Sequence, residues 1–425
     1  MSTLSSQLLP LLLLGLAVLA LTQPVMAQAP DPESKAGYEN NAGLGRGPDD
    51  ITTEIEVIDK QKDSATSIPV IDDLLEKWYG LKGYLNDEIA LQFAVAWTSL
   101  YQRVTSSPGD DQAAGGIFEV AGTWSQIGRE SGNPAIIGFR LEDRHRIGTD
   151  TTPQDLGPMS GSAWPTAVGY SEFDFTLAEL WWQQDLIKDR ISFRIGKQLP
   201  FAIYDYFALK SPKTGFTDAT FTLNPTIAFP QFGLGATISI WPTDEVYLLA
   251  GIHDADGKPE SNGFDSFFNE KEYFTIGEIG WDPTFNVGKG SYHVTAWHVD
   301  ERTDTGRPDG WGLTLFGEQQ ISGTLPFLRY GYSDGGAALL EHMVAGGVGV
   351  PNVFGEDHDV LGIGLSWGRP SAKGLDDQYA SELFYRVQVL PNVAITPSVQ
   401  MILNPARNPD KNAMAVFGIR GRIAL

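Results

Sequence analysis

From residue 89 onward, hydrophobic and polar residues alternate along the chain with a period of two. The run "IALQFAVAW" (89–97) puts five large apolar side chains on one face and Gln92 with three alanines on the other. The run "ELFYRVQVLPNVAITPSVQMILNPARNP" (382–409) repeats the pattern twice, with Arg386, Gln388 and Gln400 on the polar phase. This period is typical of β-strands that have one apolar and one polar face.

Sixteen such runs are separated by turn residues. They lie near residues 88–102, 117–126, 136–146, 172–183, 191–198, 232–241, 246–252, 273–281, 291–300, 310–320, 326–333, 338–348, 359–368, 379–389, 393–403 and 415–425. Long connections, such as 149–169 and Pro200–Gln231, alternate with short ones, such as Trp241–Glu245 and Leu390–Asn392. Outer-membrane barrels have an even number of strands, short periplasmic turns and longer outer loops. The connection near 349–358 is longer than this pattern predicts.

The two phases decide between a barrel and a soluble β-sandwich, which the alternation alone permits. Charged residues fall on the phase opposite the apolar one, as expected if the apolar phase faces lipid, where Arg costs roughly 2–4 kcal/mol at the midplane. Aromatic residues end many apolar runs, as at a membrane interface: Trp97, Tyr101, Trp124, Trp181, Trp367 and Tyr385. We therefore predict an all-β fold, a 16-stranded antiparallel transmembrane β-barrel over residues 88–425.

The chain begins with two segments of different character. Residues 1–27 hold an apolar core, Leu8–Leu21, and small residues before Ala27, which predicts an export signal without a basic start. Residues 28–87 are expected to form a short acidic periplasmic segment. Its "DPESKAGYENNAGLGRGPDD" (31–50) is typical of a flexible linker, and Ile68–Tyr84 could form an amphipathic helix. We expect no chemistry from this segment.

Composition excludes several partners and sites. The formal net charge of −23 argues against nucleic acid, which requires clustered Lys and Arg. The chain has no cysteine, so neither disulfides nor thiolate metal sites can form. We predict no cofactor and no metal.

Two motifs suggest other chemistry. "GYSDG" (331–335) matches the nucleophile elbow G-x-S-x-G, but that elbow needs a doubly wound sheet with helices between strands, so we expect Ser333 in a polar loop. "HDADG" (253–257) resembles half a calcium loop without its remaining ligands, and an Asp-rich turn is the preferred interpretation.

Several blocks, in order, resemble the carbohydrate-selective outer-membrane porins of the OprB family. The longest is "SELFYRVQVLPNVAITPSVQMILNPARNP" (381–409). Others are "WYGLKGYL" (78–85), "GFRLEDRHR" (138–146), "ELWWQQ" (179–184), "FRIGKQ" (193–198) and "LRYGYSDGG" (328–336). The resemblance implies an outer-membrane channel for passive diffusion of monosaccharides and related small polar solutes through a charged constriction. Leu425 departs from the aromatic residue on which barrel proteins commonly end.

Strand phase nominates nine pore residues that could exchange hydrogen bonds with sugar hydroxyls: Glu119, Arg140, Glu142, Arg144, Arg194, Lys197, Glu382, Arg386 and Gln400. Each could instead form a structural ion pair across the wall. Arg420 and Arg422 are expected to be structural. Trp181 and Trp182 could stack on a sugar ring, although interface anchoring is the commoner role.

Three further expectations concern the loops, the assembly and the alternatives. The connection Pro200–Gln231 is long enough to fold inward and narrow a pore, as in other porins. The expected partners are small sugars and outer-membrane lipid, and trimers are common among sixteen-stranded porins. The remaining alternatives are an outer-membrane barrel enzyme, such as a lipid hydrolase, and a secreted soluble β protein that binds glycans.

Overall fold

The computed structural model of the chain describes residues 44–60, 66, 68–128, 133–188, 190–303, 305–353 and 359–425. These residues all belong to one compact unit, Gly37–Leu425. The expected export signal and the acidic segment as far as residue 43 lie outside the described residues.

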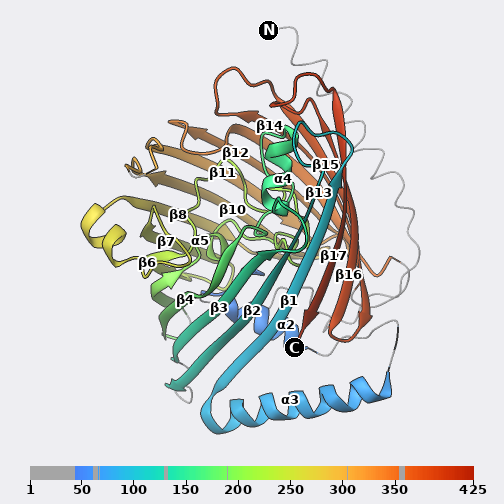
Figure 1. Cartoon of the computed structure of the whole chain (residues 1–425). Helices are drawn as coiled ribbons and strands as arrows, with labels where there is room; N and C mark the ends of the chain where they lie inside the picture. Colours follow the sequence, from blue (N-terminus) through green and yellow to red (C-terminus); the bar gives the residue numbers. More distant parts are fainter. Residues whose placement is uncertain are drawn as a thin grey trace. The chain divides into compact units, whose positions relative to one another are not determined.

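The described strands form one closed antiparallel sheet (Figure 1). Sixteen of them make the barrel wall: β1 (Leu91–Val104), β2 (Gln112–Ile127), β3 (Ala135–Arg146), β4 (Phe173–Leu186), β5 (Ile191–Gln198), β6 (Gly233–Ile240), β7 (Val246–Asp254), β8 (Tyr273–Trp281), β10 (Gly288–Val299), β11 (Gly310–Gln319), β12 (Leu325–Asp334), β13 (Leu340–Pro351), β14 (Val360–Pro370), β15 (Gln378–Leu390), β16 (Val393–Leu403) and β17 (Ala413–Ala424). The two-residue β9 (Thr284–Phe285) pairs with β10.

Closure of the sheet confirms the predicted barrel. Strand β1 pairs with β2 on one side and with β17 on the other, where Ala96 lies opposite Ala424. The barrel therefore has no unpaired edge of the kind that a sandwich retains. The soluble sandwich is wrong as an interpretation of the alternation.

The outer face of the wall is apolar. Large aliphatic and aromatic side chains alternate outward with high exposure, for example Leu328 at 62% and Ile419 at 51%. A contiguous apolar surface of this extent is not stable in water, so lipid is the solvent that it fits.

The adjacent tryptophans of β4 separate onto the two faces. Trp182 points outward with 38% exposure, whereas Trp181 is 2% exposed and packs against Arg194 inside the barrel. The expectation that Trp181 ends an apolar run at the membrane interface is wrong, because successive residues of a strand point to opposite faces.

The lengths of the connections orient the barrel. Short connections, such as 187–190, 241–245 and 391–392, lie at the end of the barrel where β17 finishes. Because periplasmic turns are the short ones, this end is the periplasmic one. The helix α3 (Pro69–Ile89) lies beside it (Figure 1), at the place expected for a helix over Ile68–Tyr84. Among the described residues, no helix combines the length and apolarity needed to cross a membrane.

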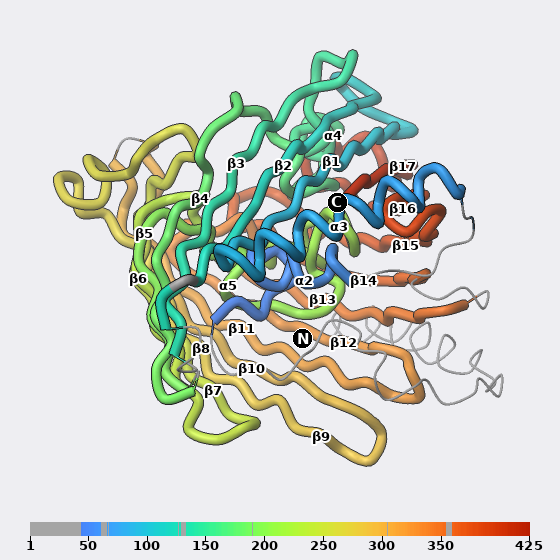
Figure 2. Tube along the Cα trace, turned by 90° about the horizontal axis from the view of Figure 1, so that it is seen from below, coloured from blue at the N-terminus to red at the C-terminus, as the bar shows by residue number. Residues whose placement is uncertain are grey.

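Three segments enter the barrel. The first, residues 44–59, contains the helix α2 (Ile51–Asp59) and is called the N-terminal strap here. The second, the connection 147–172, contains the helix α4 (Pro153–Ser160). The third, residues 199–232, contains the short helix α5 (Pro200–Ile203) and is called the inward loop. Figure 2, seen from below, shows α2 and α5 inside the ring of strands.

Part of the interior is apolar, which the alternation did not predict. Phe207, Phe216 and Phe221 of the inward loop are fully buried. Phe207 and Phe216 pack against Phe327 and Phe384 of the wall, with ring centroids 4.9–5.8 Å apart. The ring of Phe221 packs against Phe216 at 4.9 Å. The inner phase of the strands therefore does not face water everywhere, because these wall aromatics form a core with the loop.

Candidate functional site: the interior of the barrel

The inward loop is anchored to the wall on the side of β15 and β16. Glu382 accepts hydrogen bonds from the Thr217 amide (2.9 Å), the Thr217 hydroxyl (3.0 Å) and the Asp218 amide (2.8 Å). Gln400 lies opposite Glu382 in the sheet and donates to the Thr217 hydroxyl (2.9 Å). The expectation that this connection folds inward is confirmed by these contacts.

The N-terminal strap crosses the interior between two parts of the wall. At one end, Arg46 forms an ion pair with Asp282 (2.6 Å) and lies 4.5 Å from the centre of the Trp241 ring. At the other end, α2 places three isoleucines at helical spacing on small wall residues: Ile51, Ile55 and Ile58 meet the surface formed by Ala94, Ala96, Ala121 and Ala424. The strap is therefore fixed by both charge and apolar packing.

Asp50 serves two elements at once. Its carboxylate caps α2 by accepting from the Thr52 amide (3.1 Å) and accepts from Arg194 Nη1 (2.6 Å). Asp49 accepts a hydrogen bond from Ser211 of the inward loop (2.7 Å). The expectation of a flexible linker over 31–50 is wrong at Asp49 and Asp50, since both are buried.

An ion-pair cluster joins strap, wall and inward loop, and is called the central cluster here: Asp49, Glu54, Glu119, Arg140, Glu179, Lys213 and Arg422. Glu54 of the strap accepts from Arg140 (2.9 Å), Lys213 (2.7 Å) and Arg422 (2.8 Å). All of these side chains are buried. Breaking a buried ion pair by removing one partner costs about 3–5 kcal/mol, so the cluster holds its three segments together.

The wall residues of the central cluster bind one another as well. Arg140 donates to Glu179 (2.8 Å) and Glu119, and to the backbone carbonyl of Asp49 (2.9 Å). Glu119 also accepts from Lys213 (2.8 Å). The central cluster thus contains two of the nine nominated residues, Glu119 and Arg140.

The cations of the central cluster disfavour protonation of the Glu54 carboxylate in the strap. Burial by itself raises the pKa of Glu54, but Lys213, Arg140 and Arg422 outweigh it and bring the pKa well below its ordinary value. Burial likewise lowers the pKa of Lys213, and the facing Glu119 and Glu54 reverse this and raise it. Both groups are therefore charged at neutral pH.

The two nominated residues of β5, Arg194 and Lys197, have other partners. Arg194 is buried, and its guanidinium donates to Gln183 (2.9 and 3.0 Å) as well as to Asp50. Lys197 donates to the backbone carbonyls of Leu177 (3.0 Å) and Pro259.

Arg144 is the more exposed member of its pair. Glu142 is buried and accepts from Arg144, which is half-buried and also donates to Ser171 (3.3 Å). Arg140, Glu142 and Arg144 share one face of β3, as their spacing predicts.

Arg386 and Arg420 face the backbone of the inward loop. Arg386, half-buried, donates to the Thr214 carbonyl (3.2 Å). Arg420 is buried and donates to the carbonyls of Pro212 (2.7 Å) and Gly215 (2.8 Å). Together these two side chains satisfy buried backbone carbonyls of the loop, and the Pro212 carbonyl also accepts from the Tyr170 hydroxyl (3.3 Å).

A second polar cluster lies on the side of β8 to β12. Asp205 of the inward loop pairs with Arg329 and with His293 (3.3 Å). Burial raises the pKa of Asp205, but Arg329 and His293 more than offset this and bring it to about 2. Nearby, burial lowers the pKa of Lys210 to about 8. The inward loop is thus tied to the wall by charge on two sides.

Several of these functional candidates were missed in the sequence. Glu54 has a detectable signal, because Ile51, Ile55 and Ile58 follow the spacing of an amphipathic helix. Lys213 and Asp205 lie in a long connection without periodicity, so no pattern identifies their partners. Arg422 was expected to be structural, and its strand phase gives no indication that the strap lies opposite.

Ser333 lies in the barrel wall rather than at an elbow. It belongs to β12, opposite Gly312 of β11, and its buried hydroxyl donates to the Leu340 carbonyl (2.7 Å). A nucleophile elbow needs an exposed hydroxyl at a turn between a strand and a helix. The expected polar loop is wrong, and the barrel-enzyme alternative has no support from this serine.

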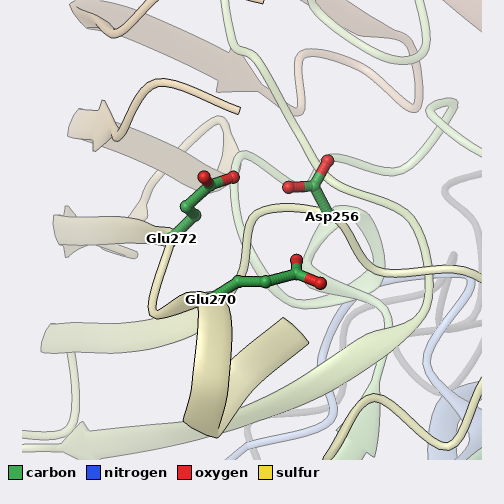
Figure 3. A group of neighbouring side chains, drawn as sticks. All are labelled: Asp256, Glu270 and Glu272. Carbon is green, nitrogen blue, oxygen red and sulfur yellow. The ribbon is translucent and has the colours of Figure 1, made fainter. Parts of the chain in front are cut away.

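Three carboxylates meet in the outer connection between β7 and β8. Asp256, Glu270 and Glu272 bring oxygens within 4.8 Å of one another (Figure 3). Glu272 already accepts from the Thr303 amide (3.1 Å), and burial together with Glu272 raises the pKa of Asp256 to about 6. A shared proton can therefore satisfy this group, and acidic neighbours alone do not establish a cation site.

Comparison with known proteins places this architecture among porins. The family described as "Carbohydrate-selective porin, OprB family" matches residues 90–310 and 312–425. Porin AaxA of Chlamydia pneumoniae is 23% identical over 318 residues, which cover 72% of each chain. Porin AaxA of Chlamydia abortus is 23% identical over 264 residues, covering 60% of this chain and 58% of that protein's length.

Solved structures agree in fold. The high-pH structure of Pseudomonas putida OprB has a TM-score of 0.65 at 13% identity and covers 82% of this chain and 97% of that one. The low-pH structure of the same protein has a TM-score of 0.50 at 13% identity, with 82% and 96% covered. The chain belongs to the OprB family of carbohydrate-selective porins, which are outer-membrane channels rather than enzymes.

Proposed function

We propose that this chain lets small sugars and related polar solutes diffuse passively across the outer membrane, selected at a constriction lined by Arg, Lys and Glu. The observation that carries the proposal is the family match over residues 90–310 and 312–425. The position of the inward loop, which brings charged wall residues opposite loop residues, adds to it.

Physical chemistry suits these side chains to sugars. A sugar that enters a narrow passage loses part of its hydration, so the wall has to replace hydrogen bonds without binding tightly. Arginine offers a planar set of donors, and a carboxylate accepts from hydroxyls. The nine proposed lining residues supply both kinds of group.

Among the nine, Arg144 and Arg386 are the best placed for direct contact with solute. Both are half-buried, whereas Glu119, Arg140 and Arg194 are buried in ion pairs. We propose that the buried residues determine the shape and charge of the passage. The half-buried residues would form hydrogen bonds with the hydroxyl groups of the sugar.

The test is single-channel recording in planar bilayers with several sugars titrated into the bath. The purified chain should conduct, and monosaccharides should reduce its current in a saturable way. Arg144→Gln together with Arg386→Gln should weaken the apparent sugar affinity by roughly 10-fold, about one charge-assisted hydrogen bond. Arg103→Gln is the control, because Arg103 forms an exposed ion pair with Asp111.

Each contrary result has its own meaning. If the protein inserts into the bilayer and no conductance is measured, the proposed channel function is wrong. Conductance that no sugar reduces would leave a channel without sugar selectivity. Assembly into homotrimers also stays a proposal, which the mass of the protein in detergent tests directly.

A further inference from the structure

We infer that the N-terminal strap, residues 44–59, is part of the constriction and that its three buried acidic residues, Asp49, Asp50 and Glu54, set the charge selectivity of the channel. The inference rests on the proposed channel function and adds a determinant from outside the barrel wall.

The charges of the interior support this role. Counting the ion pairs of the central cluster together with Arg194 and Asp50, the wall and the inward loop supply four cations and two anions. The cations are Arg140, Arg194, Lys213 and Arg422, and the anions are Glu119 and Glu179. The wall and loop alone therefore carry 4 − 2 = +2.

The strap reverses the sign of this charge. Asp49, Asp50 and Glu54 contribute −3, so the group as a whole carries +2 − 3 = −1. A wall built to hold two uncompensated buried cations would be costly by itself, since unpaired buried charges are strongly unfavourable. The strap is thus the electrostatic complement of the wall.

The fit is steric as well as electrostatic. A Cβ atom on Gly47 would lie 2.1 Å from the Ala202 carbonyl oxygen of α5, so the strap passes the inward loop in direct contact. Two segments whose backbones approach this closely in the interior reduce the space open to solute, and charged groups at a narrow passage control which ions enter.

The experiment compares two glutamates of the same helix. Glu54→Gln should lower the permeability of K⁺ relative to Cl⁻ by roughly threefold or more, measured as a shift of the reversal potential in a KCl gradient. Adding Asp50→Asn should shift it further toward anions. Glu56→Gln is the matched control, because Glu56 forms its ion pair at a half-exposed position with Lys60, the residue after the strap.

A second variant tests the steric part without altering charge. Gly47→Ala should displace the strap and raise single-channel conductance, whereas Gly80→Ala on α3, where a Cβ meets nothing within 4 Å, should leave conductance unchanged. Equal reversal potentials for the parent, Glu54→Gln and Glu56→Gln would overturn the inference. If Glu54→Gln does not insert, unaltered conductance and selectivity in Gly47→Ala would overturn it instead.

These outcomes are distinct from failure of the proposed function. A parent protein that conducts ions but ignores sugars leaves the strap measurable, because selectivity between ions needs no sugar. A parent protein that inserts but does not conduct removes the channel and the strap inference together.

Discussion

At the scale of single residues, Glu54 forms ion pairs with three cations in the barrel interior. It faces Arg140 and Arg422 of the wall and Lys213 of the inward loop, with Glu119 as a nearby like charge. Three cations against one neighbouring anion favour the ionised form. The strap is consequently held by the Glu54 carboxylate, which stays ionised below its ordinary pKa.

This arrangement predicts a pH dependence. The pKa of Glu54 is lower in the folded protein than its ordinary value of 4.5, because Lys213, Arg140 and Arg422 outweigh burial. A lowered pKa contributes stability that is present above about pH 4.5 and is lost as pH falls through the folded value. We expect the difference in reversal potential between the parent and Glu54→Gln to persist from pH 7 to pH 4. Loss of this difference at a pH above 4 would contradict the lowered pKa of Glu54.

At the scale of elements, the inward loop is a long connection that packs inside the barrel and is enclosed by its wall. Its aromatic residues form a core with wall phenylalanines, and its backbone is bound by Glu382, Arg386 and Arg420. Aromatic packing fixes where the loop lies, and the hydrogen bonds fix its register on the wall.

Replacement of Glu382 tests this anchoring. Glu382→Gln exchanges one acceptor oxygen for a donor that faces the amides of Thr217 and Asp218, so the loop should lose roughly 1–3 kcal/mol of local stability. Hydrogen exchange followed by mass spectrometry should show faster exchange over residues 207–221. Glu341→Gln is the control, because the Glu341 side chain is 47% exposed. Equal exchange in both variants would show that the aromatic core holds the loop alone.

The sequence predicted the elements of the wall far better than what fills it. Each strand carries its own alternation, and the same signal sorts Arg140, Glu142 and Glu382 onto the inner face. Contacts inside the barrel are different, because Glu54 and Lys213 are brought together by segments 159 residues apart. No local period encodes such a pairing, and the inner phase of Phe384 does not reveal that it faces a packed loop rather than water.

At the scale of the whole molecule, the barrel reverses the usual arrangement of a soluble protein. Its polar and charged groups are enclosed, and Leu328, Ile419 and similar residues face outward. The free energy of this arrangement depends on lipid, because only lipid makes the outer surface favourable.

A charged substitution on the outer face tests whether the stability of the barrel depends on contact with lipid. Leu328→Arg should lower the free energy of unfolding in bilayers by about 2–4 kcal/mol if the site lies near the midplane, and by less toward the interface. Urea titration with heat-modifiable gel mobility gives the folded fraction. Leu339→Arg is the control, since Leu339 lies in the connection 335–339 outside the strands. A similar loss in both variants would argue against lipid contact at Leu328.

The seam between β1 and β17 has a consequence for the order of assembly. These strands pair residues as far apart as Ala96 and Ala424, so the wall closes only when both ends of the barrel sequence are in place. The strap precedes β1, and the inward loop precedes eleven of the sixteen wall strands, β6 to β8 and β10 to β17. The strap and the inward loop therefore come before most of the wall in the chain. Pairing of β1 with β17 is the step that encloses both segments.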